Sequence, residues 1–196
     1  MRLYRLVPMD SRFNAWLFWY EDNDDHIRPR RVYSDLVCAK CGKLDEVAAI
    51  NRGLDPDIKI RSKRDYIGTT DGFELVTRRA REAFGEEGIK GLRFIQLSDG
   101  NHSVLWPELR VPTDLSTAGF QFVGPKCARC GRYREACVGP FSQSLTIPDD
   151  PMVVFASEVW NENRRGRVLW LFAQEPAANA LKRMRLTGLE IIKATG

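Results

Sequence analysis

Two copies of one short cysteine turn constrain this chain more than any other feature. The first copy, residues 38–42, reads Cys-Ala-Lys-Cys-Gly, and the second, residues 127–131, reads Cys-Ala-Arg-Cys-Gly. A tetrahedral zinc ion takes four thiolates, and a C-x-x-C turn supplies two of them. The glycine that ends each copy allows a positive φ, so backbone N–H groups can point back at the sulfur atoms. The sequence therefore predicts one structural Zn2+ per chain, bound by Cys38, Cys41, Cys127 and Cys130.

The two turns are far apart in the sequence (127 − 41 = 86). The halves of most compact zinc modules are separated by roughly 15–20 residues, so we expect this metal to join two distant loops of a larger domain. Two independent redox or free-thiol turns are the alternative. A thiol oxidoreductase would place its C-x-x-C at a helix N-terminus, whereas the glycine after each second cysteine favours a turn.

The fifth cysteine, Cys137, lies outside both copies, seven residues after Cys130. We expect a buried spare thiol, because cysteine is among the most buried residue types; replacement of one of the four ligands is the alternative. The N-terminus lacks the apolar segment and cleavage site of a signal peptide, and no apolar run is long enough to span a bilayer. An odd number of cysteines without a secretion signal favours reduced thiols, so we expect a cytoplasmic protein with no membrane partner.

The composition indicates a single folded domain, residues 1–196, with a core that does not depend wholly on metal. The apolar fraction is 43% of 196 residues, which is enough to bury a sizeable interior. The net charge is +4, from 30 basic and 26 acidic residues. This charge is too balanced to imply nucleic acid by itself, and we expect no nucleic-acid partner.

The periodicity predicts an α+β fold with mainly antiparallel sheet and two principal helices. Asp71 and Glu74 fit a capping box, and apolar residues follow at helical spacing, which predicts a helix at about 72–87. Pro176 suits a first helical turn, which predicts a second helix at about 176–186 and a strand at 189–192. We also expect a hairpin between residues 3–7 and 13–20, and a half-exposed basic strand at 58–64.

A weak internal echo divides the chain into halves of about 1–100 and 101–196. Each half carries one cysteine turn upstream of a helix, and each helix leads into a Gly-Leu-containing strand, at residues 91–97 and 188–194. An ancient duplication and a convergent helix-to-strand connection both explain this echo, because glycine is common where helices end.

The chain carries none of the motifs typical of common enzyme classes. It has no phosphate-binding glycine loop, no metalloprotease motif and no nucleophile elbow. Its two histidines, His26 and His102, lie in polar, turn-like segments without the neighbours of a catalytic triad. Four thiolates on one zinc also leave no open position for a catalytic water. We therefore expect a protein that is not an enzyme.

The wide spacing of the two C-x-x-C-G turns resembles the double-CXXCG motif family of myxobacteria. The match is carried by the two turns, by the helix-and-strand segment at 71–97 and by the strand-helix-strand arrangement at 168–192. Members of that family are similar to immunity proteins against contact-dependent toxins exchanged between kin cells. The resemblance implies a cytosolic protein that binds one cognate toxin and blocks it, and it carries over no toxin-contacting residue.

Interface anchors in such a protein would be exposed aromatic and arginine side chains. The candidates for partner binding are a charged loop at residues 21–31 and the group Trp160, Arg164, Arg165 and Arg167. The alternative function is a zinc-ribbon-like nucleic-acid-binding or regulatory protein. Basic clusters at residues 59–64, 78–81 and 182–185 motivate that alternative, and the acidic residues interspersed along the chain argue against it.

Overall fold

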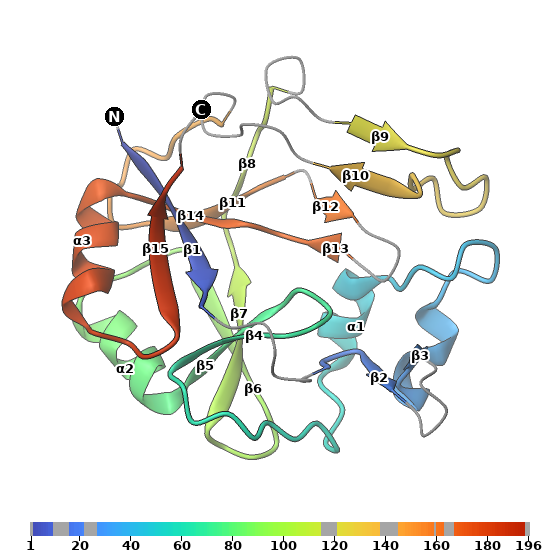
Figure 1. Cartoon of the computed structure of the whole chain (residues 1–196), viewed down its shortest axis with the longest axis horizontal. Helices are drawn as coiled ribbons and strands as arrows, with labels where there is room; N and C mark the ends of the chain where they lie inside the picture. Colours follow the sequence, from blue (N-terminus) through green and yellow to red (C-terminus); the bar gives the residue numbers. More distant parts are fainter. Residues whose placement is uncertain are drawn as a thin grey trace.

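The computed structural model describes residues 2–9, 16–21, 27–114, 121–137, 145–158, 160–162 and 167–194. Within these residues the chain forms mainly antiparallel sheets of short strands, with three α-helices and one 3-10 helix (Figure 1). The expected α+β class is therefore confirmed. Among the helices described, none has the length and apolar character needed to cross a membrane.

A four-stranded antiparallel sheet is formed by the middle of the sequence. Its order is β4 (Tyr66–Gly68), β5 (Glu74–Thr77), β7 (His102–Pro107) and β6 (Leu92–Gln96). Helix α2 (Arg78–Glu86) follows β5 directly and leads to β6. Because β7 lies between β5 and β6 and is antiparallel to both, α2 connects two parallel strands across one intervening strand.

A five-stranded sheet combines the N-terminal strand with the C-terminal part of the chain. Its order is β15 (Leu189–Lys193), β1 (Leu3–Pro8), β14 (Leu171–Gln174), β11 (Val154–Ser157) and β8 (Arg110–Val111). Only β11 and β8 pair in parallel among these strands. Helix α3 (Glu175–Arg183) follows β14 directly and leads to β15, with β1 between the two strands.

These two sheets share one strand order. The series β4-β5-β7-β6 corresponds to β11-β14-β1-β15, and the connecting helix in each has nine residues. Strand β1, from the start of the chain, takes the place that β7 has in the first sheet. The shared strand order could arise from a duplication followed by a permutation of the chain, or from convergence on a favourable connection. Duplication of the halves at about 1–100 and 101–196 therefore stays a prediction.

The remaining elements surround the two cysteine turns. A small sheet has the order β13 (Arg167–Val168), β12 (Asn161–Glu162), β10 (Glu135–Cys137) and β9 (Gln121–Val123). Strands β2 (Trp19–Glu21) and β3 (Ile27–Pro29) form a hairpin. The 3-10 helix η1 (Arg31–Leu36) and helix α1 (Glu46–Arg52) flank the first cysteine turn.

Two of the apolar clusters lie on the two faces of the β4-β5-β7-β6 sheet, and a third includes Leu3, Phe155 and Phe172 of the five-stranded sheet. On one face Val76 joins a cluster that also includes Ala80 of α2, Ala173 of β14 and Leu181 of α3. On the other face Leu75 joins a cluster with the segment at 16–19, η1 and α1. The two large sheets therefore share one hydrophobic core, and a second core supports the elements around the first cysteine turn.

The predicted helix at 72–87 begins later in the structure, because its first residues form a strand that is buried on both faces. Residues 74–77 form strand β5, and the helix begins at Arg78 with Thr77 as its N-cap, whose Oγ1 accepts from Ala80 N at 3.3 Å. A strand buried on both faces reads as a continuous apolar run, which also fits helical spacing. The second predicted helix, at 176–186, is present as α3 but ends earlier, at Arg183, before Arg185 with a φ of 50°.

One predicted strand pairing and one predicted strand are wrong. Residues 3–7 form β1, but both edges of β1 are occupied by β14 and β15, so no hairpin with residues 16–20 can form. Leu17 and Phe18 instead donate to Asp71, the residue predicted to cap a helix. Its carboxylate accepts from Leu17 N at 3.1 Å and from Phe18 N at 2.8 Å. Residues 58–64 form no strand, and Ile58 anchors them in the second core.

Candidate metal centre

The two cysteine turns have the same backbone conformation. In the first, Gly42 N donates to Cys38 O and Cys38 N donates to Lys43 O, each at 2.8 Å. In the second, Gly131 N donates to Cys127 O at 2.8 Å, and Cys127 N donates to Arg132 O at 2.7 Å. Gly42 and Gly131 both have a φ of +72°, a conformation that L side chains rarely adopt. The glycine in each turn therefore permits the closure that places two cysteines on one loop.

The fold brings the four predicted ligands together. The Sγ atoms of Cys38, Cys41, Cys127 and Cys130 all lie within 4.8 Å of one another. The Cys38 and Cys127 sulfurs are 3.9 Å apart, and the Cys41 and Cys130 sulfurs are 3.5 Å apart. Tetrahedral zinc with bonds of about 2.3 Å separates its sulfur ligands by about 3.8 Å. The four cysteines can therefore hold a metal ion, and their spacing and soft thiolate donors fit zinc.

Backbone amides prepare two of these sulfurs to bind metal. The N–H groups of Cys130 and Arg129 lower the pKa of Cys127 to about 6, and those of Cys41 and Lys40 lower the pKa of Cys38. The pKa of Cys41 is raised to about 12, chiefly because its sulfur loses water among the other sulfurs, although the residue as a whole is exposed. A cation bound among the sulfurs would oppose that rise by favouring the thiolate.

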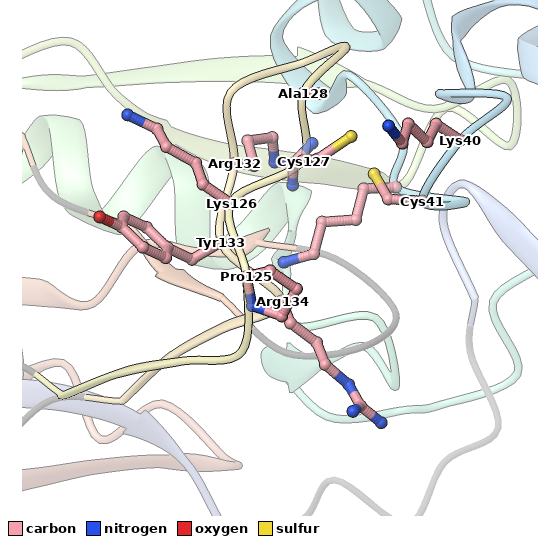
Figure 2. A pocket seen from close by; sticks show the side chains of 10 residues that line it. Lys40, Cys41, Pro125, Lys126, Cys127, Ala128, Arg132, Tyr133 and Arg134 are labelled. Atoms are coloured by element: carbon pink, nitrogen blue, oxygen red, sulfur yellow. The ribbon is translucent and has the colours of Figure 1, made fainter.

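The second cysteine turn is the tip of a hairpin. It connects β9 and β10, which pair from Glu135↔Val123 to Cys137↔Gln121. Figure 2 shows that this loop brings Cys127 opposite Cys41 of the first turn. Cys137 lies in β10, and its side chain falls outside the described part of the structure, so its predicted role as a spare thiol stays a prediction.

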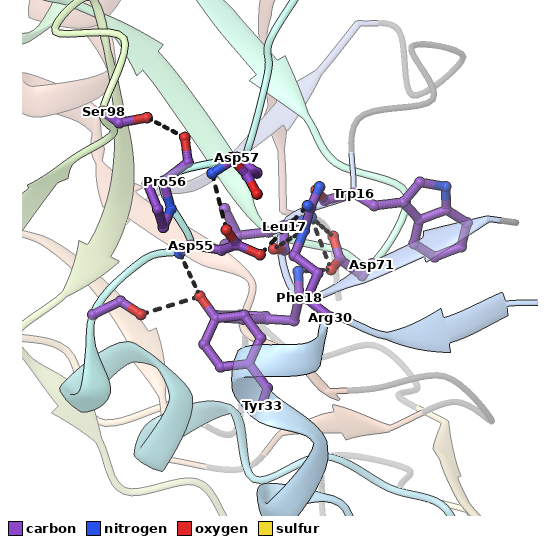
Figure 3. A network of polar contacts seen from close by, with 11 residues as sticks. Trp16, Leu17, Phe18, Arg30, Tyr33, Asp55, Pro56, Asp57, Asp71 and Ser98 are labelled. Atoms are coloured by element: carbon purple, nitrogen blue, oxygen red, sulfur yellow. Dashed lines mark hydrogen bonds and ion pairs between the residues drawn. The ribbon is translucent and has the colours of Figure 1, made fainter.

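The first cysteine turn is held by a polar network between η1, α1 and the N-terminal segment (Figure 3). Tyr33 of η1 is fully buried; its hydroxyl donates to Gly53 O at 3.1 Å and accepts from Asp55 N at 2.8 Å. Arg30 donates to Leu17 O at 3.1 Å and lies 3.6 Å from a carboxylate oxygen of Asp55. These contacts fix both ends of the segment that carries Cys38 and Cys41.

Two basic residues directly after the glycines extend the repeat and were not predicted as part of the site. Lys43 and Arg132 are both buried, with 3% and 9% exposure. Arg132 donates to Leu44 O, just after the first turn, and its Nη2 lies 3.3 Å from Glu46 Oε1 at the start of α1. The signal that could have found them is the six-residue match Cys-Ala-Lys-Cys-Gly-Lys and Cys-Ala-Arg-Cys-Gly-Arg. Arg132 thus joins the two loops independently of any metal.

The predicted partner-binding group is only partly described. Trp160 is half-buried; its ring centroid lies 6.1 Å from that of Trp106, and the Arg110 guanidinium lies 5.0 Å from it. Arg167 belongs to β13, but its side chain lies outside the described residues, as do Arg164 and Arg165 entirely. Within the charged loop at 21–31, residues 22–26 also lie outside them, while Glu21 ends β2 and Ile27–Pro29 form β3. The role of this group in partner binding stays a prediction.

The chain matches no family model and no curated protein.

Proposed function

We propose that this protein is an immunity protein that binds one cognate bacterial toxin and neutralises it by stoichiometric occlusion. The observation that carries the proposal is the convergence of the two C-x-x-C-G turns into one four-cysteine cluster. The same duplicated turn carries the resemblance to the double-CXXCG family. Its closure in space indicates that both turns serve one site rather than two unrelated thiol functions.

The metal in this proposal is one structural Zn2+, and the protein acts without catalysis in the cytoplasm. Four cysteine ligands complete the tetrahedral coordination of zinc, so bound zinc would stabilise the two loops and would not activate water. Cys38, Cys41, Cys127 and Cys130 hold the ion in this proposal, and Arg132 supports them from the second loop.

Inhibition by occlusion needs a rigid surface of complementary shape and charge, and it needs no reactive group. The buried aromatic network around Tyr33 and the joined cysteine loops give this protein a firmly held surface around the cluster. We propose the cognate toxin as the one protein partner. Charged loops would accelerate the encounter and determine which toxin is recognised.

The test is a titration of toxin activity. The probe is the product of the gene immediately upstream, which the proposal expects to encode a toxin, assayed at concentrations well above the dissociation constant. Stoichiometric occlusion predicts a breakpoint near one equivalent and a complex that co-elutes in gel filtration. Disarming of the toxin by a small fraction of one equivalent, or protection without complex formation, would show that the protein acts as an enzyme and that the proposal is wrong.

A further inference from the structure

A cationic pocket lies directly against the cysteine cluster. It is a cavity of about 650 Å³ whose walls come from both cysteine loops (Figure 2). Its lining contains no aspartate or glutamate among the described residues. Two of the cluster cysteines, Cys41 and Cys127, form part of its wall. The other ionic or aromatic side chains that line it are five cations and one aromatic ring: Lys40, Lys43, Lys126, Arg132, Arg134 and Tyr133.

The positive charge of this pocket is only partly used by the protein. Arg132 is paired with Glu46. Four thiolates around one divalent metal ion would keep a net negative charge, and this charge would attract the remaining cations. Lys40, Lys126 and Arg134 are nevertheless exposed, and none of the three forms an ion pair within the described part of the chain. A lining with several cations and no carboxylate favours an anionic ligand.

An aromatic pair stands beside these cations. The rings of Phe122 on β9 and Tyr133 on the second cysteine loop have centroids 4.7 Å apart and an interplanar angle of 36°. The ammonium of Lys126 lies 5.6 Å from the centroid of Tyr133, and Phe122 is 44% exposed. An exposed aromatic ring next to lysine and arginine side chains is the combination on which proteins stack the bases of unpaired strands.

We propose that this pocket binds single-stranded nucleic acid. Backbone phosphates would lie against Lys40, Lys126 and Arg134, and a base would stack on the Phe122–Tyr133 pair. The cavity has the volume of a site for a small ligand, which suits one or two nucleotides of a strand better than a rigid duplex. The net charge of +4 for the whole chain does not reveal this site, because the cations are gathered at one place.

The pocket depends on the union of the two cysteine loops. Lys40 comes from the first loop and Lys126, Tyr133 and Arg134 from the second, so the ligand would meet a complete wall only when both loops are joined. Chelation of the metal should therefore weaken nucleic-acid binding as well as stability. The inference does not rest on the proposed immunity role, because it concerns a different ligand.

The direct test is fluorescence anisotropy with the full-length, metal-loaded protein. The probes are fluorescein-labelled oligo-dT and oligo-U of roughly 12 nucleotides, and a duplex of the same length, at salt between about 50 and 200 mM. Three phosphate contacts predict a slope of log K against log salt of about −2, since each contact to a single strand contributes about −0.7. The single strands should bind more tightly than the duplex.

Variants separate the two parts of the site. K126Q/R134Q should weaken binding about tenfold and reduce the salt slope by about 1.4, since two phosphate contacts are lost. Phe122→Leu should weaken binding about tenfold without changing the slope, because it removes the stacking surface and keeps an apolar side chain. The matched control is K59Q/K63Q, which removes two exposed lysines outside the pocket and should leave binding unchanged. Metal content and far-UV circular dichroism confirm that each variant is folded.

Three outcomes would overturn the inference. The first is no binding of either single strand at the lower salt concentration. The second is equal weakening by K126Q/R134Q and by K59Q/K63Q, which would indicate attraction to the protein as a whole. The third is displacement of the oligonucleotide by poly-glutamate at an equal concentration of charges, together with no effect of Phe122→Leu. That third result would assign the pocket to an acidic protein partner.

Discussion

Arg132 of the second cysteine loop lies 3.3 Å from Glu46 at the start of α1, and both side chains are buried. The two residues are 86 positions apart in the sequence. The same guanidinium donates to the backbone carbonyl of Leu44. The two cysteine loops are therefore joined twice, once where their sulfur atoms gather around a common centre and once by this ion pair.

Loss of Arg132 should destabilise the protein strongly. Arg132→Met takes from the buried Glu46 carboxylate its charged partner, and breaking a buried pair in this way typically costs about 3–5 kcal/mol. Urea denaturation of the metal-loaded protein measures the change in the free energy of unfolding. The double variant R132M/E46Q should recover more than half of the loss. Equal stability of the single and double variants would show that the ion pair does not carry the effect.

The cysteine cluster should hold one zinc ion per chain. Elemental analysis of protein purified without chelator should find about one zinc, and Cys41→Ser should lose it, because three thiolates and a hydroxyl make a poorer site. Chelation should lower the free energy of unfolding by several kcal/mol, since metal binding is coupled to folding. Cys137→Ser is the matched control and should keep its metal. Loss of zinc in Cys137→Ser but not in Cys127→Ser would contradict the ligand assignment.

Glu74 should make the protein less stable as the pH rises from about 4.5 to about 7. Burial raises the pKa of Glu74 from 4.5 to about 7, although the Tyr66 hydroxyl and Arg5 oppose the rise. Between these two pKa values the folded state binds more protons than the unfolded state. The contribution of Glu74 to the free energy of unfolding is therefore fully present below about pH 4.5 and is lost as the pH rises to about 7. Denaturation at several pH values should give a slope of at most about 1.4 kcal/mol per pH unit, absent in Glu74→Gln. An unchanged slope in that variant would rule out Glu74 as the cause.

Asp65 should bind the two large sheets together. This buried carboxylate accepts from Arg79 Nη2 at 2.5 Å and, across 122 positions, from Thr187 N at 2.9 Å and Thr187 Oγ1 at 2.8 Å. Asp65→Ala leaves these donors without that acceptor and should cost about 2–4 kcal/mol. The contacts, chiefly the one with Arg79, also lower the pKa of Asp65. The contribution of Asp65 to the free energy of unfolding is therefore present when the pH is above its ordinary pKa of 3.8, and it is lost as the pH falls. Asp99→Ala is the comparison: this carboxylate accepts from Asn101 N and His102 N within a single turn, so its loss breaks no contact between the sheets and should cost less.

The cysteine cluster could be predicted from sequence because its chemistry is local. Two cysteines and a glycine within five residues determine the turn, and the fold had only to bring the two turns together. The repeat extends to Arg132, but the partners of Arg132 could not be predicted in the same way, because they lie 86 and 88 positions away and no pattern in the sequence points to them. The identity of the metal and the toxin partner remain predictions.

The errors in the predicted fold arise where tertiary contacts override the local sequence pattern. Leu75 and Val76 face two different cores, so their segment has the apolar run of a helix while it forms a strand. Strand β1 was expected to pair with its nearest neighbour in the sequence, but its partners are β14 and β15. Strand pairing depends on which edges are available in the folded sheet, and a single sequence does not show this.

The position of β1 between β14 and β15 also determines the order in which this protein can fold during its synthesis. Both partners come from residues 171–193, so the ribosome must add more than 160 residues after β1 before the strand can pair. At about 5–20 residues per second, β1 waits on the order of ten seconds with both edges open to other chains. The β4-β5-β7-β6 sheet has all of its strands by residue 107 and can form first. A nascent chain halted before residue 171 would retain an unpaired first strand that no later segment can cover.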